Sequence, residues 1–424
     1  MFERIFVPAE FRDALSDGAW LQAMLDAEGA LAAAEARAGV IAEEAAEAIA
    51  AACRADQFDV TAIADEGRAP GNPVEPLVRA LGEAVEGHAA GYVHWGATSQ
   101  DILDTATMLV SRAALDLILV RLAEVAGECA KLAETHRSTP IAGRTLLQQA
   151  VPTTFGLKAA GWLVAVLEAR RRLTSIRQDR LAVQLGGAAG TLGALGDAGP
   201  EVLRLFAEEL DLQEPVVPWH TNRVRIAELG AALDVAAGAL AKIGLDVGLL
   251  SQTEVGEARE AEGGASSTMP QKRNPVGSAL AVACARQVHA QASVLAAALP
   301  QEHERALGAW HSEWPALRNA LAYTGGAADA ARRALDGLEV DTERMRANLE
   351  LTDGLVMAEK ASFLLARELG RREAHQRVAQ AASGGGPLSE ELGLDAADLD
   401  PKAYVGAAET FVDRALAAYR DELS

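Results

Sequence analysis

Apolar and polar positions follow a helical period along most of the chain. The clearest stretch begins at Ile226, where apolar residues recur alternately three and four positions apart and no proline interrupts them. These positions are Ile226, Leu229, Leu233, Ala236, Leu240, Ile243, Val247 and Leu250. The spacing forms a 3.5-residue seam, which is typical of a long helix packed in a bundle. It predicts one uninterrupted helix over 226–250.

Similar long helical patterns run from about residue 104 to 136 and from about 154 to 183. A shorter helix is expected from Gly18 to Ala38, capped by Asp17 and ended near Gly39. Alanine, leucine, glutamate and arginine dominate the chain, and alternating β-branched stretches are scarce. We therefore predict an all-α protein built on a bundle of long helices.

Composition and charge narrow the possible functions. The 424 residues suggest two or three domains, and 50% hydrophobic with 23% charged residues is the balance of a folded globular protein. Lysine and arginine number 39 against 60 aspartates and glutamates, so the net charge is −21. This balance argues against a general nucleic-acid or anionic-membrane binder, since both need a positive field. It does not exclude an anionic substrate, which senses the local field of its pocket.

Cysteine usage and the lack of targeting signals suggest a cellular location. Cys53, Cys129 and Cys284 are widely spaced and form no CxxC pair, so we interpret them as small buried residues in a reducing compartment. The N-terminal residues have no basic start followed by an apolar core, and no uncharged apolar run reaches about 18 residues. We expect a soluble cytoplasmic protein. Because neither an HExxH pair nor a glycine-rich nucleotide motif occurs, we expect no metal and no cofactor.

One loop combines glycine, hydroxyl and cationic residues. It spans 263–275 and reads Gly-Gly-Ala-Ser-Ser-Thr-Met-Pro-Gln-Lys-Arg-Asn-Pro. Backbone N–H groups, together with the charges of Lys272 and Arg273, suit carboxylates and a carbanion whose charge spreads onto a carboxylate. The composition alone is equally compatible with a polar surface loop.

The order of residues in this loop resembles the most diagnostic loop of the fumarase/aspartase superfamily. Residues 93–101, Val-His-Trp-Gly-Ala-Thr-Ser-Gln-Asp, resemble the first family motif, and residues 143–148, Gly-Arg-Thr-Leu-Leu-Gln, resemble the second. The resemblance covers nearly the whole chain. It implies an all-α fold with a small N-terminal domain (1–103), a central long-helix bundle that forms a tetramer core (104–345) and a small C-terminal domain (346–424).

The resemblance also implies roles for individual residues. Ser266 corresponds to the family's proton-transfer residue, and Lys272 would stabilise its alkoxide. The residues that correspond to substrate contacts are Thr98, Ser99, Thr145, Gln148, Asn274 and Arg305. The candidates for lining the pocket are His94, Leu146 and Trp310.

Two departures from the family pattern indicate a branch. Leu146 stands where most family lyases have a histidine, and Ala279 stands where the glutamate that pairs with this histidine is expected. The pattern resembles the bacterial 3-carboxy-cis,cis-muconate cycloisomerases. It implies lactonisation of a tricarboxylate to a carboxymuconolactone, in the protocatechuate branch of the β-ketoadipate pathway of aromatic degradation. Because a carboxylate of the substrate is itself the nucleophile, no enzyme base is needed to activate it.

Two other functions remain open. An adenylosuccinate-like C–N lyase that releases fumarate is disfavoured by Leu146 and Ala279. A structural protein on the same scaffold is disfavoured because Ser266, Lys272 and Asn274 are retained.

The resemblance further implies a homotetramer whose active sites are shared between subunits, with no nucleic-acid or membrane partner. We expect other subunits to cover the seam over 226–250, because it is too long and too apolar for one small domain to cover.

Overall fold

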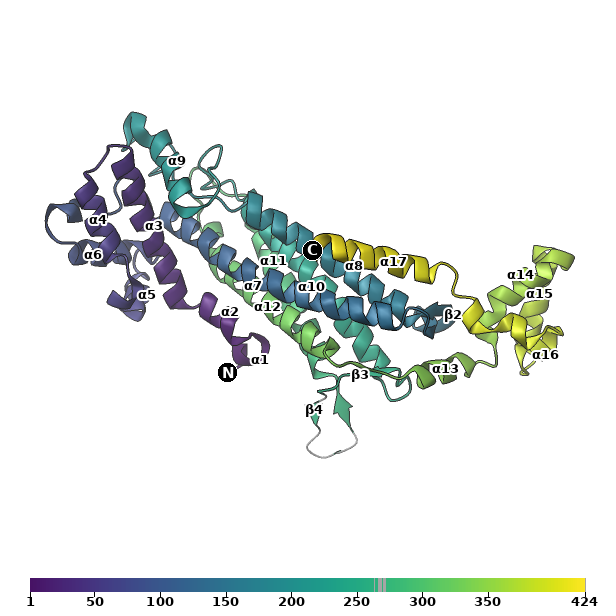
Figure 1. The fold of residues 1–424 in the computed structure, drawn as a ribbon. Coiled ribbons are helices and arrows are strands. Elements are labelled where there is room, and N and C mark those ends of the chain that lie inside the picture. The colour runs from purple at the N-terminus through teal and green to yellow at the C-terminus, as the bar shows by residue number, and fades with distance from the viewer. Residues whose placement is uncertain (263, 266–268, 270–271, 424) are drawn as a thin grey trace. The chain divides into compact units, whose positions relative to one another are not determined.

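The computed structural model describes residues 1–262, 264–265, 269 and 272–423, and most of them are helical (Figure 1). Five of the described helices have 22 residues or more. They are α7 (Ser99–Thr135), α8 (Phe155–Asp179), α10 (Val224–Leu250), α11 (Val276–Ala297) and α12 (Ala309–Leu335). The predicted all-α fold with long helices is confirmed, and the helices expected over 104–136, 154–183 and 226–250 correspond to α7, α8 and α10.

The other described elements are shorter. The helices are α1 (Glu3–Phe6), α2 (Ala9–Ala14), α3 (Asp17–Arg37), α4 (Glu43–Ala52), α5 (Val60–Glu66), α6 (Val74–Ala84), α9 (Gly199–Leu210), α13 (Thr342–Glu350), α14 (Ala358–Leu369), α15 (Arg371–Ala381), α16 (Leu388–Leu392) and α17 (Ala408–Leu423). The strands are β1 (Pro140–Thr145), β2 (Gln148–Thr154), β3 (Ala258–Arg259), β4 (Gly264–Ala265), β5 (Arg273–Asn274) and β6 (Glu339–Val340). They form antiparallel pairs, β1 with β2, β3 with β6 and β4 with β5.

Helix α3 begins one residue away from the predicted cap. The Oγ of Ser16 accepts a hydrogen bond from the N–H of Ala19 at 3.2 Å, so Ser16 is the N-cap and Asp17 is the first helical residue. The prediction of Asp17 as the cap is therefore wrong. Serine and aspartate are both good caps and stand side by side here, so the sequence gives no way to choose between them. The helix ends at Arg37, just before Gly39, whose φ is +73°.

The apolar seam of α10 is covered by its own chain. The eight apolar positions of the seam, the first of which is Ile226 and the last Leu250, are all buried within the single chain. The expectation that other subunits are needed to cover this seam is therefore wrong. Helix α11 of the same chain packs closely on α10, since a Cβ added to Gly230 would lie 2.7 Å from the side chain of Leu295.

Small residues let the long helices approach closely. A Cβ added to Gly244 of α10 would lie 2.7 Å from the backbone oxygen of Ser278 in α11. A Cβ added to Gly277 of α11 would lie 3.0 Å from the backbone oxygen of Ala330 in α12. Only glycine permits such contacts between helix backbones, so these positions fix how α11 packs on its two neighbours.

The chain forms two compact units. Unit 1 comprises Met1–Val120, Arg171–Ala237 and Cys284–Gly326, and unit 2 comprises Arg121–Arg170, Gly238–Ala283 and Ala327–Ser424. Each of the five long helices contributes one part to each unit. The division into 1–103, 104–345 and 346–424 stays a prediction. None of the described helices is both long and apolar enough to cross a membrane.

Candidate active site

A buried carboxylate near the start of α7 holds two loops of unit 1 together. Oδ2 of Asp101 accepts hydrogen bonds from the backbone N–H groups of Thr98 (3.0 Å) and Gly187 (2.9 Å). Its Oδ1 accepts a hydrogen bond from the N–H of Gly186 at 2.9 Å and lies 2.7 Å from Nε2 of His220. Three backbone donors and one imidazole thus satisfy a single buried carboxylate. Asp101 fixes the loop before α7 against the loop at 186–187.

Arg305 connects the same two loops a second time. Its Nη1 donates to Oγ1 of Thr98 at 2.8 Å, and its Nη2 donates to the backbone oxygen of Ala188 at 3.1 Å. These bonds use two of the five N–H groups of the guanidinium. Ser99, the next residue after Thr98, is the first residue of α7. A guanidinium beside a hydroxyl at the start of a helix is an arrangement that suits a carboxylate.

Two glycines allow these loops to touch. A Cβ on Gly187 would lie 2.9 Å from the backbone oxygen of Gly96, and a Cβ on Gly96 would lie 2.7 Å from the side chain of Leu195. Both glycines also have positive φ angles, +66° at Gly187 and +71° at Gly96. Glycine is therefore required at both positions by space and by backbone conformation.

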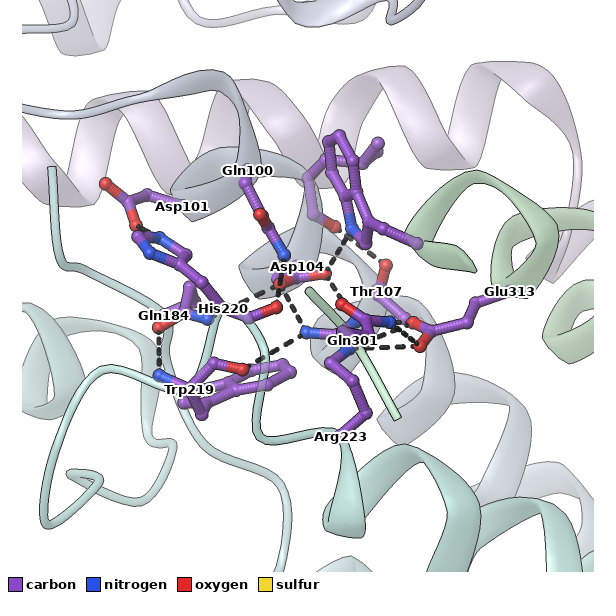
Figure 2. A network of polar contacts seen from close by, with 12 residues as sticks. Gln100, Asp101, Asp104, Thr107, Gln184, Trp219, His220, Arg223, Gln301 and Glu313 are labelled. Atoms are coloured by element: carbon purple, nitrogen blue, oxygen red, sulfur yellow. Dashed lines mark hydrogen bonds and ion pairs between the residues drawn. The ribbon is translucent and has the colours of Figure 1, made fainter. Parts of the chain in front are cut away.

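A second buried network supports α7 one turn further along (Figure 2). Arg223 binds Asp104 through Nη1 (2.7 Å) and Nη2 (2.9 Å), and its Nη2 also binds Glu313 at 2.6 Å. Gln301 donates to the same Glu313 at 2.9 Å. Burial by itself would lower the pKa of Arg223, but Asp104 and Glu313 raise it above its ordinary value. The guanidinium therefore stays charged in the interior, because two carboxylates pair with it.

Trp310, a predicted pocket-lining residue, belongs to this network. Its side chain is buried, and its Nε1 donates to Oδ1 of Asp104 at 3.0 Å. Its ring also contacts that of Trp314, with 4.8 Å between the ring centroids. The role of Trp310 in lining a pocket stays a prediction.

His94 of the first motif pairs with a carboxylate from α3. Its Nδ1 lies 2.6 Å from Oε1 of Glu28, and its side chain is 17% exposed, whereas that of Glu28 is 1% exposed. The backbone of His94 is in the left-handed region, with φ of +61°. Burial alone would lower the pKa of His94, but the charge and the hydrogen bond of Glu28, together with the charge of Asp101, raise the pKa above its ordinary value.

The second motif lies on a hairpin of unit 2. The register pairs Thr145 with Gln148, which leaves Leu146 and Leu147 as a two-residue turn between β1 and β2. Both leucines have positive φ, +50° and +66°, as a type I′ turn requires. Their side chains are 96% and 76% exposed, and those of Thr145 and Gln148 are exposed as well. The predicted contacts of this motif therefore lie together at one exposed hairpin tip.

The strand residues next to this tip, by contrast, are firmly bound. Arg144 makes a bidentate ion pair with the buried Glu257, at 2.8 and 2.7 Å. Asn348 donates to the same Glu257 at 2.8 Å, and its backbone oxygen accepts from Gln149 at 2.9 Å. These bonds tie the strands to the segment before β3 and to α13.

The third motif is described only in part. Ser266, the predicted proton-transfer residue, lies outside the described residues. Lys272 is exposed, and its backbone N–H donates to the oxygen of Met269 at 3.0 Å. Asn274 lies on β5 and donates from Nδ2 to the oxygen of Gly264 on β4 at 3.3 Å.

Glu260 holds the helix that follows this loop. Its two carboxylate oxygens accept hydrogen bonds from the N–H groups of Gly277 (2.9 Å) and Ser278 (2.8 Å), in the first turn of α11. A carboxylate at this end of a helix satisfies N–H groups that lack helical partners and complements the helix dipole. The loop thus leaves and rejoins the bundle at fixed points.

The structure places the predicted residues in three groups. Thr98 and Arg305 are in direct contact, with Ser99 adjacent. Thr145, Leu146 and Gln148 share the hairpin tip, and Lys272 and Asn274 lie near the end of the third motif.

Sequence reasoning missed the residues that hold the first group in place. They are Asp101, His220 and Arg223. Asp101 ends the first motif and His220 follows a tryptophan after a proline. The one signal in the sequence was Asp101, a charged residue inside the first motif to which no role had been assigned.

Comparisons with known proteins show the family of this chain. The lyase family matches residues 8–290. The chain is 47% identical to 3-carboxy-cis,cis-muconate cycloisomerase of Pseudomonas aeruginosa, over 99% of this chain and 96% of that protein. It is also 47% identical to nitrosuccinate lyase of Streptomyces davaonensis, over 95% of this chain and 91% of that protein.

A solved structure is similar over its whole length. The 3-carboxy-cis,cis-muconate lactonizing enzyme from Pseudomonas putida matches with a TM-score of 0.93 and 42% sequence identity, and the match covers 100% of both chains. Three motifs in the family order, one shared fold and full-length similarity leave a single conclusion: the chain belongs to the lyase family of the fumarase/aspartase superfamily.

Proposed function

We propose that the protein is a 3-carboxy-cis,cis-muconate cycloisomerase, acting on a small tricarboxylate. One substrate carboxylate oxygen forms a C–O bond with the carbon γ to that carboxylate, which is the nearer carbon of the second double bond of the diene. The displaced electron pair moves towards a neighbouring carboxylate, and a proton delivered to carbon completes the γ-lactone. The enzyme then has two tasks, which are to bind and stabilise negative charge and to deliver one proton.

The residues of this chain divide these tasks. Thr98, Ser99 and Arg305 bind one carboxylate, where the bonds to Asp101 already hold the loop in place. Lys272 stabilises the charge that develops on the substrate, and Ser266 delivers the proton. The remaining contacts come from Thr145, Gln148 and Asn274. No cofactor takes part in this chemistry.

One observation carries the proposal over an ordinary C–N lyase. The second motif has Leu146, at the exposed hairpin tip, where family lyases carry a histidine, and its expected glutamate partner is replaced by Ala279 on α11. No acid–base pair is possible at these two positions. Lactonisation tolerates this loss because its nucleophile is already ionised and is tethered to the carbon that it attacks.

The proposal is tested by following the ultraviolet absorbance of the diene of 3-carboxy-cis,cis-muconate. We expect absorbance to fall with enzyme-dependent, saturable kinetics and the product to be a γ-lactone by NMR. A purified, folded protein that leaves the diene unchanged would contradict the proposal.

A second function is favoured by one specific finding, the relative named nitrosuccinate lyase at the same 47% identity. Loss of nitrite from nitrosuccinate breaks a C–N bond and removes a proton from the adjacent carbon, leaving fumarate. This reaction needs a base, whereas lactonisation needs an acid. Assays of nitrite release from nitrosuccinate and of fumarate release from adenylosuccinate, run beside the diene assay, separate the three activities.

We further propose a cytoplasmic homotetramer with shared active sites. Supporting this assembly, α10 carries a second apolar stripe that its own chain leaves exposed. Val235, Leu245 and Leu249 are each more than 40% exposed, and with Ala231, Gly238 and the exposed Lys242 between them they follow the same spacing of three and four. Such a stripe on a soluble protein is typical of a helix interface. Light scattering should give the mass of four chains, and Leu245→Glu should lower it.

A further inference from the structure

We infer that Glu28 is a positioning residue for the proposed reaction: through a buried hydrogen bond it keeps His94 oriented and cationic, so that Nε2 of His94 binds a substrate carboxylate. The inference rests on the proposed function and adds a contact to its site. It also gives the chain a histidine–carboxylate pair at a position different from the one lost at Leu146 and Ala279.

The hydrogen bond between Glu28 and His94 fixes the imidazole. A carboxylate only accepts hydrogen bonds, so the ring nitrogen that faces it, Nδ1, must carry a proton. The second nitrogen, Nε2, is then an acceptor in the neutral ring and a donor in the imidazolium. Glu28 lies on α3 and is almost fully buried, whereas His94 keeps part of its side chain exposed. Glu28 therefore supports the ring from the interior and leaves its other edge open to a ligand.

The backbone of His94 is held in an unfavourable conformation. Its φ of +61° lies in the left-handed region, which residues with a Cβ rarely adopt. The N–H of Ala97 donates to the oxygen of His94 at 3.4 Å, so a tight turn joins His94 to Thr98. Strained backbone of this kind persists only where surrounding contacts enforce it, and it is concentrated at functional sites. This turn spans His94 to Ala97, so His94 lies four residues before Thr98, whose hydroxyl accepts a hydrogen bond from Arg305.

The charges around His94 favour its protonated form. Glu28 faces it from α3 and Asp101 acts on it from α7, and together they raise its pKa above the ordinary value against the opposing effect of burial. Arg305 is a nearby cation, held by the Thr98 hydroxyl and the backbone oxygen of Ala188. A trianionic substrate approaching a chain of net charge −21 gains from a second local cation.

His220 is a second histidine that pairs with a carboxylate, and it differs from His94 in how far its side chain is exposed. His220 also pairs with a carboxylate, Asp101, but its side chain is 4% exposed and both partners lie in the interior. His94 is more exposed than His220 and occurs within the first motif, next to the predicted contacts Thr98 and Ser99. Of these two histidines, His94 is therefore the one that a substrate can reach.

The test measures KM and kcat for 3-carboxy-cis,cis-muconate between pH 6 and 9. Wild type is compared with Glu28→Gln and His94→Gln. The matched control is Glu35→Gln, because Glu35 lies two turns further along α3 and is equally buried but is not bonded to His94.

The expected result is a pH-dependent loss of binding. A group with a raised pKa is fully protonated at low pH and loses its charge as the pH rises through that pKa, so wild-type KM should rise towards pH 9. In Glu28→Gln this rise should begin about one pH unit lower, with KM near that of wild type at pH 6 and kcat changed less than about twofold. His94→Gln should raise KM about tenfold at pH 6 and remove the pH dependence. Glu35→Gln should follow the wild-type curve.

A second measurement does not depend on turnover or on the folding of any variant. The imidazole Cε1–H signals of wild type are titrated by NMR, alone and with the saturated tricarboxylate tricarballylate. We expect tricarballylate to shift the signal of His94 and raise its pKa. If the wild type does not consume the muconate, the proposed function is wrong, and this titration still tests His94 separately.

Three results would overturn the inference. Glu28→Gln could follow wild type at every pH, His94→Gln could keep the wild-type KM at pH 6, or tricarballylate could bind without changing the titration of His94. Each would show that the pair serves the packing of α3 against the first motif and does not bind substrate.

Discussion

The first and second motifs are built in opposite ways. In the first, the polar groups find partners inside the same chain: Asp101 collects four donors, and Thr98 receives the guanidinium of Arg305. In the second, the strand residue next to the hairpin tip is bound, through the ion pair of Arg144 with Glu257. The tip carries two left-handed leucines whose side chains face solvent.

This difference indicates which motif a single chain can hold in place and which motif needs another chain. A left-handed leucine costs about 1–2 kcal/mol, and an exposed leucine side chain gains nothing from burial. A tip with two such residues is unfavourable in an isolated chain and becomes reasonable when another chain covers it. The first motif is self-sufficient, whereas the second is expected to function only in the proposed assembly.

Ser266→Ala should have the largest effect on activity, because it removes the proposed proton donor. We expect kcat and kcat/KM to fall together by about 10²- to 10⁴-fold, while substrate binding is nearly unchanged. Steady-state kinetics and equilibrium binding of the substrate measure the two quantities. A variant with near-normal kcat would remove Ser266 from the mechanism.

Asp101→Asn and Thr145→Val test the contrast between the motifs directly. Asp101→Asn removes a buried charge that several donors satisfy, so we expect at least a 10²-fold loss of kcat/KM and a loss of about 3 kcal/mol in the free energy of unfolding. Thr145→Val, at the exposed tip, should abolish most of the activity but change the free energy of unfolding by less than about 0.5 kcal/mol. Urea unfolding and kinetics on both variants make the comparison. Equal stability losses would contradict it.

The assembly can be tested by mixing two inactive variants. Ser266→Ala and Thr145→Val subunits are dissociated, combined in equal amounts and reassembled. If each site takes these two residues from different subunits, about a quarter of the sites regain both native residues. Each variant reassembled alone is the control. Mixed tetramers that remain inactive would show that the second motif serves its own chain, as the first does.

The sequence predicts the elements better than the contacts between them. The alternating three- and four-residue spacing correctly predicts α10, because a helical period is visible in the local sequence. The substrate-binding roles of Thr98 and Arg305 stay predictions, although the structure brings the two side chains together across 207 residues of chain.

Buried polar partners are harder to predict. His220 reaches Asp101 across 119 residues, and nothing in either local sequence shows that the two are buried together. Glu28 and Glu35 lie in an alanine-rich helix, where glutamates are usually solvent-exposed, yet both are buried in the structure. Which face of a helix is covered depends on tertiary packing, and a single sequence does not encode that in a local pattern.

Glu35→Gln is expected to have the smallest effect on activity. It tests whether every buried polar group of unit 1 finds its partner inside the same chain. Neither carboxylate oxygen of Glu35 has a hydrogen-bond partner among the described residues. Burial, with a smaller contribution from Glu28, raises its pKa from 4.5 to about 9. Between pH 4.5 and about 9, the folded protein keeps the proton on Glu35 whereas the unfolded chain releases it. Ionisation of Glu35 in the unfolded chain therefore makes the protein less stable as the pH rises.

The glutamine variant lacks this dependence on pH. Its free energy of unfolding should equal that of wild type near pH 5, and the difference in its favour should then grow by about 1.4 kcal/mol per pH unit. Urea unfolding at pH 5, 6, 7 and 8 measures the difference, with the exposed Glu47→Gln as control. Parallel curves for wild type and Glu35→Gln would mean that Glu35 is ionised in the folded protein and has a partner outside the described residues of its own chain.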